Sequence, residues 1–498
     1  MAIGGIDVAV LAFYMAGVVA IGFWVGRGQR DLQSYLLGGR DLPWWAILGS
    51  LVATETSTAT FLSVPGIAYA REHGDLRFLQ LALGYIVGRC VIAVVLLPWF
   101  FRGELYTAYE VLHERFGGAT KATASAIFLV TRNLGDGLRL YLTAIALREV
   151  VGFSLPACIV IIGLATILYT VFGGMKSVVW NDCVQFVVYM AGGVLALLVI
   201  GYRLPGGWDE LIAFGTAHDK FRLLDFHWEL ADAYTFWAAV VGGMFLTLGT
   251  HGTDQMMVQR YLCARNQRDA GRALVASGLV VFVQFALFLF LGVALASYYD
   301  RFAPDVQFKK PDYVFATFIV RELAPNVGLI GLLLAAVFAA AMSTLSSSLN
   351  SSASAAVADF YLPWRRKQLS AQHQVDVSRL MTVVFGAVQI GVAIGADRLS
   401  SSVVQDALAI ASFAAGLLLG IFFLGVLTRR VGQTAALIGL IAGLIALLEA
   451  KFVAPTFGLK VAWPWFALIG AVTTFSVGYV ASFAAERRHS PSHDERFS

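Results

Sequence analysis

Residues 340–354 read Ala-Ala-Met-Ser-Thr-Leu-Ser-Ser-Ser-Leu-Asn-Ser-Ser-Ala-Ser, a run of hydroxyl side chains within an otherwise apolar stretch. A bilayer core offers no water to such groups, so they must face other protein groups or a polar cavity. Helical spacing places the polar side chains of four residues along one face: Ser343, Thr344, Ser347 and Asn350. An oxygen-lined face at bilayer depth suits a hard cation such as sodium, which predicts ion-coupled transport.

The composition is that of a membrane protein. Of the 498 residues, 58% are hydrophobic and 14% are charged, and the mean hydropathy is +0.73. Hydrophobic runs recur along the whole chain, which predicts one membrane domain over residues 1–498, embedded in a lipid bilayer. The formal net charge of +4 is small and confined to loops, so no nucleic-acid partner is expected.

The hydrophobic runs predict an all-α integral membrane fold with about 13 transmembrane helices, each about 20 residues or longer. No basic residue precedes the first run, which is long enough to span, so we interpret it as a retained helix and not as a cleaved signal peptide. The predicted spans cover residues 5–26, 44–69, 78–101, 122–150, 154–174, 180–202, 235–262, 272–299, 327–359, 377–396, 403–427, 432–452 and 462–485.

Basic residues in the short loops predict the orientation of the chain. They gather on one side of the predicted membrane, in groups that include Arg27, Arg40, Arg102, Arg115, Arg265, Arg365 and Arg429. Because basic loops stay in the cytoplasm, this side is expected to be cytoplasmic. The N-terminus then lies outside the plasma (inner) membrane, and the C-terminus lies in the cytoplasm.

Two predicted spans contain residues that break helices. The span over 44–69 contains Ser63-Val64-Pro65-Gly66, and the span over 235–262 contains Gly249-Thr250-His251-Gly252. Proline removes a backbone donor and glycine loosens the helix, so both places are predicted to free backbone groups at membrane depth.

The two broken spans lie five spans apart and therefore enter the membrane in opposite directions. Interrupted helices at matching places in two inverted halves indicate a transporter site. This predicts two inverted five-helix repeats, over residues 44–202 and 235–427. The first helix over 5–26 and the two C-terminal helices over 432–485 are then peripheral.

The first broken span also carries a dense set of polar residues, Ala53-Thr54-Glu55-Thr56-Ser57-Thr58-Ala59-Thr60. These side chains are costly in a membrane unless they line a cavity. We expect carbonyls freed at the break, such as those of Ala53 and Thr56, to face the hydroxyls of the span over 327–359. Five or six oxygens from the two helices would form a sodium cage.

Three motifs resemble the sodium/solute symporter family, which includes the sodium/glucose, sodium/proline and bacterial sialic acid transporters. They are Phe61-Leu62-Ser63-Val64-Pro65-Gly66, Thr253-Asp254-Gln255-Met256-Met257-Val258-Gln259-Arg260 and Met342-Ser343-Thr344-Leu345-Ser346-Ser347-Ser348-Leu349-Asn350-Ser351. The resemblance covers about residues 5–430. It implies a LeuT-like fold that works by alternating access, with sodium as the coupling ion.

The resemblance also implies ion sites. The family's main sodium site matches the carbonyls of Ala53, Thr56 and Ala340 and the hydroxyls of Ser343 and Thr344. Some members bind a second sodium, and that site matches Asp182, Ser346 and Ser347. The alternatives are hydroxyls that only pack or bond to the preceding turn, and a helix-capping aspartate at Asp182.

The span over 122–150 is a second polar region, where Arg132, Asp136 and Arg139 lie at helical spacing. Both cations can meet the one carboxylate, which leaves one guanidinium spare. A guanidinium that faces a cavity can clamp a substrate carboxylate through two hydrogen bonds. The sialic acid branch resembles this arrangement, and Arg139 is the best match. A structural ion network is the alternative.

Four further residues are candidates for substrate binding: Thr58, Thr60, Ser63 and Gln80. The sugar-transporting branches place polar side chains just before Phe61, where this chain has Ala59 and Thr60, and this difference weakens the hypothesis of a sugar substrate. An interhelical hydrogen bond is the alternative for Gln80. Arg89, midway along its span, has no evident partner in the sequence.

The favoured interpretation is a sodium-coupled symporter for a small organic solute that bears a carboxylate. An enzyme is not expected, since no paired carboxylates, histidine cluster or nucleophile motif has the required spacing. One alternative is a proton-coupled or facilitative transporter, with Glu55, Asp136 or Asp182 as proton carrier. Another is a transporter-like sensor that works through a separate partner. The sequence leaves open the substrate, the stoichiometry and the oligomeric state.

Overall fold

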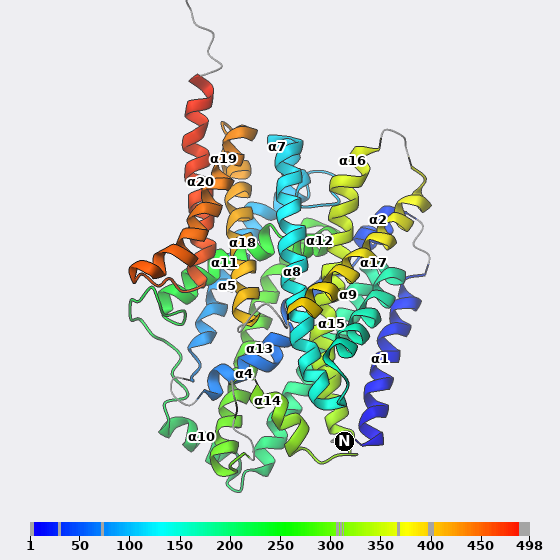
Figure 1. Ribbon diagram of the computed structural model, residues 1–498, viewed down its shortest axis with the longest axis vertical. Coiled ribbons are helices and arrows are strands. Elements are labelled where there is room, and N and C mark those ends of the chain that lie inside the picture. The colour runs from blue at the N-terminus through cyan, green and yellow to red at the C-terminus, as the bar shows by residue number, and fades with distance from the viewer. Residues whose placement is uncertain are drawn as a thin grey trace, which may run out of the picture.

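The computed structural model describes residues 4–27, 31–70, 74–304, 308, 311, 313–365, 369–396 and 403–487. All regular elements within these ranges are helices. Helix α1 (Gly5–Val25) begins at the end of the molecule that holds α10 (Gly207–Ala217) and α14 (Tyr313–Thr317). Helices α7 (Glu110–Phe116) and α16 (Leu362–Trp364) lie at the opposite end (Figure 1).

The structure confirms the multi-span helical architecture. Within the described residues, nine helices are long and apolar enough to cross a membrane, and a pair bent by 61° adds a tenth. That pair is α3 (Trp44–Glu55) and α4 (Thr58–Tyr69). Helix α8 (Gly118–Val151) is long enough but carries several charged residues, and α9 (Leu155–Arg203) covers two predicted spans. Each predicted span is therefore helical, although fewer helices than the roughly 13 predicted are both long and apolar enough to be identified as membrane-spanning within the described residues.

The remaining long elements follow in chain order. They are α5 (Gln80–Val91), which continues through a π-helical turn (Ile92–Leu96) into α6 (Leu97–Phe100); α11 (Gly243–Gly252); α12 (Gln255–Leu262); α13 (Gln267–Arg301); α15 (Leu329–Ala355); α17 (Ala371–Ala396); α18 (Val403–Leu427); α19 (Gln433–Leu448); and α20 (Pro464–Arg487).

Helix α9 joins two predicted spans without a loop between them. The backbone bends at Gly174, where φ is 53° and ψ is −164°. Only glycine adopts this conformation readily, because it has no Cβ. One glycine thus takes the place of the loop expected between residues 174 and 180.

Burial separates a central helix from peripheral ones. The apolar window of α15 is 89% buried, against 11% for α1 and 28% for α19 with its extension. Figure 1 places α1 at one flank of the molecule and α19 with α20 at the other. Asp7 fastens α1 to the start of α15 by accepting hydrogen bonds from the backbone N–H groups of Asn326 (2.6 Å) and Gly331 (3.2 Å).

The first helix break does not lie where the sequence predicted it. It falls at Thr56 and Ser57, between α3 and α4, whereas Pro65 lies inside α4. Proline removes only one internal hydrogen bond from α4. Helix α13 also packs closely against α4 at Pro65, because a Cβ added to Gly292 would lie 2.1 Å from the Pro65 carbonyl oxygen. The helix opens instead where another helix supplies new partners for its carbonyls.

The second break lies slightly beyond the predicted Gly249–Gly252 motif. Helix α11 continues through Gly252, and α12 begins after Asp254. The Asp254 side chain accepts a hydrogen bond from the backbone N–H of Met256 at 2.8 Å and so caps α12. The capping residue, and not the glycines, determines where this helix restarts.

Candidate functional site

The carbonyls at the end of α3 face the hydroxyls of α15. Ser343 donates a hydrogen bond to the Ala53 carbonyl at 2.7 Å, and Thr344 donates to the Thr54 carbonyl at 3.0 Å. The two hydroxyl oxygens also lie 3.3 and 3.5 Å from the Ala340 carbonyl. The structure therefore brings four of the five predicted main-site residues together and adds Thr54, which the sequence analysis missed.

This oxygen set is neutral and buried. Ser343 is fully buried and Thr344 is 2% exposed. A cation between the helices would replace the hydrogen bonds from Ser343 and Thr344, because their oxygens and the carbonyls could all coordinate it. Neutral oxygen ligands of this kind suit a hard cation.

Thr56, the fifth predicted residue, turns its side chain the other way. Its hydroxyl donates to the Val52 carbonyl at 2.8 Å and accepts a hydrogen bond from Gln284 at 2.6 Å. The predicted ligand is the backbone carbonyl of Thr56, so the orientation of its hydroxyl leaves that prediction unchanged.

The candidate second ion site already holds a guanidinium. The Asp182 carboxylate accepts hydrogen bonds from Ser50 (2.5 Å) and Arg260 (3.0 Å), and Arg260 also donates to Ser347. The other Asp182 oxygen, Oδ1, has no hydrogen-bond partner among the described residues. Ser346 donates to the Ser343 carbonyl at 3.2 Å.

These contacts change two expectations about the second site. Asp182 lies inside α9 and is fully buried, so the alternative of a helix-capping aspartate is wrong. Arg260 ends the Thr253–Arg260 motif, but its pairing with Asp182 was not predicted, because the two residues lie 78 positions apart in the sequence. The sequence feature that could have indicated the pairing is Asp182 itself, a carboxylate in a predicted span with no basic residue beside it. A buried charge of this kind needs a partner from elsewhere in the fold.

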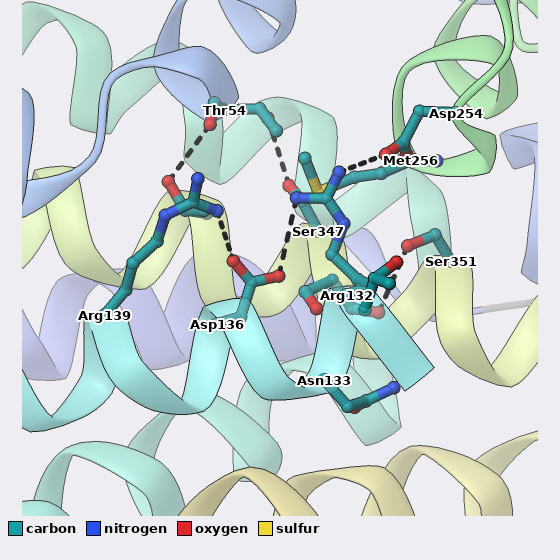
Figure 2. Close-up of polar contacts among 12 residues, drawn as sticks. Thr54, Arg132, Asn133, Asp136, Arg139, Asp254, Met256, Ser347 and Ser351 are labelled. Carbon is teal, nitrogen blue, oxygen red and sulfur yellow. Dashed lines mark hydrogen bonds and ion pairs between the residues drawn. The ribbon is translucent and has the colours of Figure 1, made fainter. Parts of the chain in front are cut away.

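The charged residues of α8 form a network with the second helix break. Figure 2 shows the Asp136 carboxylate between the guanidinium groups of Arg139 and Arg132, with Asp254 also paired to Arg132. Two arginines meet two aspartates, so the charges cancel and no arginine is spare, in contrast to the sequence prediction. Arg139 keeps 23% of its side chain exposed and lines a small cavity together with Arg132, Thr250 and Asp254.

The other substrate candidates occupy different surroundings. The Thr58 hydroxyl is buried against that of Thr143 on α8, at 2.9 Å, and Thr60 and Ser63 are half-buried on α4. Gln80 is fully buried, and its amide donates to the carbonyls of Arg77 and Tyr234 at 3.1 and 2.9 Å. Gln80 thus bonds to the turn before its own helix and to a non-helical segment, and not to a neighbouring helix as its alternative role required.

Arg89, for which the sequence showed no partner, lies at a junction of four helices. Its guanidinium pairs with Glu55 of α3, donates to Ser277 of α13 at 2.6 Å and lies 3.2 Å from the His251 ring nitrogen of α11. Arg89 and Ser277 are fully buried and His251 is 2% exposed. On α3, residues 53 and 54 therefore face α15, while residue 55 faces α5, α11 and α13.

A cavity of about 430 Å³ opens beside the other end of α4, where Gly66, Ala70, Asp75 and Arg77 line it. The Lys220 ammonium caps this helix by donating to the carbonyls of Ala68 (3.2 Å) and Ala70 (2.7 Å). Burial lowers the pKa of Lys220, and the nearby Asp75 carboxylate partly offsets this effect.

Comparison with known proteins identifies the class. The sodium:solute symporter family pattern matches residues 35–443. The chain is 31% identical to the human sodium/iodide cotransporter, over 89% of this chain and 69% of that one. It is 30% identical to sodium-coupled monocarboxylate transporter 1 of Xenopus laevis, over 87% and 69% of the two chains.

A solved structure of a Na⁺-coupled sialic acid symporter, in a substrate-bound outward-open state, superposes with a TM-score of 0.87. It has 28% sequence identity and covers 97% of this chain and 98% of that one. This chain therefore belongs to the sodium:solute symporter family. It is a multi-pass membrane transporter and not an enzyme, and sodium is its coupling ion, as the sequence predicted.

Proposed function

We propose that the protein takes up a small carboxylate-bearing anion together with sodium, and that the break between α3 and α4 holds the main sodium ion. The observation that carries this proposal is the set of facing oxygens on α3 and α15. The proposed ligands are the carbonyls of Ala53, Thr56 and Ala340 and the hydroxyls of Ser343 and Thr344. By linkage, bound sodium raises substrate affinity by the same factor as substrate raises sodium affinity.

Charge supports an anionic substrate. Iodide, monocarboxylates and sialic acid, named for the similar proteins, are all anions. Arg139 has a partly exposed guanidinium that could bind a substrate carboxylate. Thr58, Thr60 and Ser63 of α4 are the further proposed substrate-binding residues. Because the charges around Asp136 already cancel, the sodium ion would supply the positive charge that favours an anion nearby.

We extend the proposal to a second ion and to the orientation. The free Asp182 oxygen supports a second cation held with Ser346 and Ser347, although Arg260 already offsets the carboxylate charge. The end of the molecule that holds α7 and α16 carries basic residues, including Arg115 of α7 and Arg365 directly after α16, which supports a cytoplasmic location for it. The N-terminus would then be outside, and the repeats would cover 44–202 and 235–427.

Uptake by the reconstituted protein tests the proposal. Liposomes with an inward sodium gradient, or a choline gradient as the reference, would receive radiolabelled pyruvate, sialic acid, iodide or glucose. We expect a carboxylate to enter only with sodium. The Ser343→Ala/Thr344→Ala variant should raise the sodium concentration for half-maximal uptake at least about tenfold, because it removes two ion ligands.

Ser351→Ala is the matched control, since the Ser351 hydroxyl donates only to the Ser348 carbonyl of its own helix. It should keep the sodium dependence of the unmodified protein. Equal uptake in choline would overturn sodium coupling of the substrate, and exclusive uptake of glucose or iodide would overturn the carboxylate. An unchanged sodium dependence in the double variant would remove the ion from this site.

A further inference from the structure

The Thr56 hydroxyl belongs to a closed cluster on the side of the break away from α15. Gln284 of α13 donates its amide N–H to this hydroxyl at 2.6 Å. The hydroxyl of Tyr189, on the second half of α9, lies 3.2 Å from both Thr56 Oγ1 and the Gln284 carbonyl oxygen. Each of the three polar groups therefore contacts the other two.

The cluster is buried and joins both predicted repeats. Tyr189 and Gln284 are fully buried, and Thr56 is 1% exposed. Thr56 and Tyr189 belong to the first predicted repeat, whereas Gln284 belongs to the second. Buried polar groups are held together firmly when each has a partner, because losing one leaves the others unsatisfied.

Thr56 connects this cluster to the last turn of α3 by hydrogen bonds. Its backbone N–H and its hydroxyl both donate to the Val52 carbonyl, at 3.0 and 2.8 Å. The next two carbonyls, those of Ala53 and Thr54, are the ones that face Ser343 and Thr344. The chain opens immediately after Thr56, so no further helical turn holds these carbonyls in direction.

We propose that Gln284 and Tyr189 are positioning residues for the main sodium site and act through the Thr56 hydroxyl. This inference rests on the proposed ion site between α3 and α15. Two different sets of contacts then hold the break. The hydrogen bonds to α15 are exchanged for sodium, while those to Gln284 and Tyr189 persist and keep the carbonyls aimed at the ion.

Sodium binding by the full-length detergent-purified protein tests the proposal without knowledge of the substrate. The measurement is the rise in melting temperature with NaCl, at constant ionic strength set by choline chloride, fitted for the sodium concentration at half-effect. Thr56→Val keeps the backbone carbonyl and the shape of the side chain but removes the hydroxyl. We expect Thr56→Val and Gln284→Leu each to raise the half-effect concentration about tenfold, the scale of one buried hydrogen bond.

The pair should also be non-additive, because both changes disrupt one cluster. Thr56→Ser restores the hydroxyl and should return the half-effect concentration to within twofold of the unmodified protein. Thr166→Val is the matched control: the Thr166 hydroxyl donates to the carbonyl four residues earlier, at 2.9 Å, but lies on the first half of α9. It can lower the melting temperature in choline but should not change the half-effect concentration.

The outcomes separate this inference from the site on which it rests. If Ser343→Ala weakens the sodium response while Thr56→Val and Gln284→Leu stay within twofold, the positioning role is overturned and the ion site stands. If Thr56→Ser behaves like Thr56→Val, the hydroxyl is not the connecting group and the inference fails. If Ser343→Ala also leaves the sodium response unchanged, the ion site itself is wrong.

Discussion

The two broken helices occupy equivalent places in the predicted repeats but are stabilised by different chemistry. At the first break, the α3 carbonyls receive hydrogen bonds from α15, and Ser57 makes no side-chain cap for α4. At the second, Asp254 caps α12 with its own carboxylate, which also pairs with Arg132. The contacts between the α3 carbonyls and α15 are neutral and can be exchanged for an ion, whereas Asp254 at the second break makes charged contacts.

This difference assigns different tasks to the two breaks. Neutral hydroxyls can release a carbonyl to a cation at small cost, whereas a partly buried ion pair is costly to separate. The first break is therefore suited to bind an ion. The second break is suited to hold α12 against α8.

The largest expected effect concerns Arg260 of α12, which bonds to Ser50 of α3 and to Asp182 of α9. Arg260→Met would leave the fully buried Asp182 without a counter-charge, and we expect a loss of about 3–5 kcal/mol in the free energy of unfolding. Denaturant unfolding of the purified protein measures this loss. Asp182→Asn/Arg260→Met removes both charges and should recover much of the stability; a double variant no more stable than the single one would contradict the pairing.

A smaller effect is expected at the cap of the second break. Asp254→Ala removes both the cap and the Arg132 partner, for an expected loss of about 2–3 kcal/mol. Asp254→Asn can still cap α12, so it should be about 1 kcal/mol more stable than the alanine variant. Both variants should keep the sodium half-effect concentration measured by thermal shift. A tenfold change there would mean that the two breaks do not divide their tasks in this way.

The smallest effect is expected at Pro65, which the sequence placed at the break. Pro65→Ala restores a backbone N–H inside α4, so the free energy of unfolding should stay the same or rise by about 1 kcal/mol. The sodium half-effect concentration should not change. A marked loss of sodium affinity in this variant would indicate that the Ser63–Gly66 motif, and not Thr56, is the break that matters for sodium binding.

Much of the architecture could be predicted, because hydrophobic length and the cost of polar groups in lipid act locally along the chain. This is why the spans and the oxygen-rich α15 were found. The position of the first break could not be found in this way. Proline and glycine report only local preference, whereas the break at Thr56 depends on partners supplied by α15.

The polar residues of α15 illustrate the same limit. Helical spacing suggested one oxygen-lined face, but the Asn350 amide oxygen accepts a hydrogen bond from Gln259 on α12, at 2.9 Å. Ser348 accepts one from Gln389 on α17, also at 2.9 Å. Among the described α15 side chains, Ser343 and Thr344 are the ones that donate to the α3 carbonyls. Spacing shows that a helix is polar, but the neighbouring helices decide which polar group meets which partner.

Lys220 has a consequence for observing the protein at work. Lys220 as a whole is 4% exposed, and its amine donates to carbonyls at the end of α4, beside the cavity lined by Asp75 and Arg77. An acylating reagent on that side of the membrane can react with the Lys220 amine only after the end of α4 separates from the segment that carries Lys220. The rate of Lys220 acylation would then report how often α4 moves, and its response to sodium would show whether the ion slows or speeds that motion.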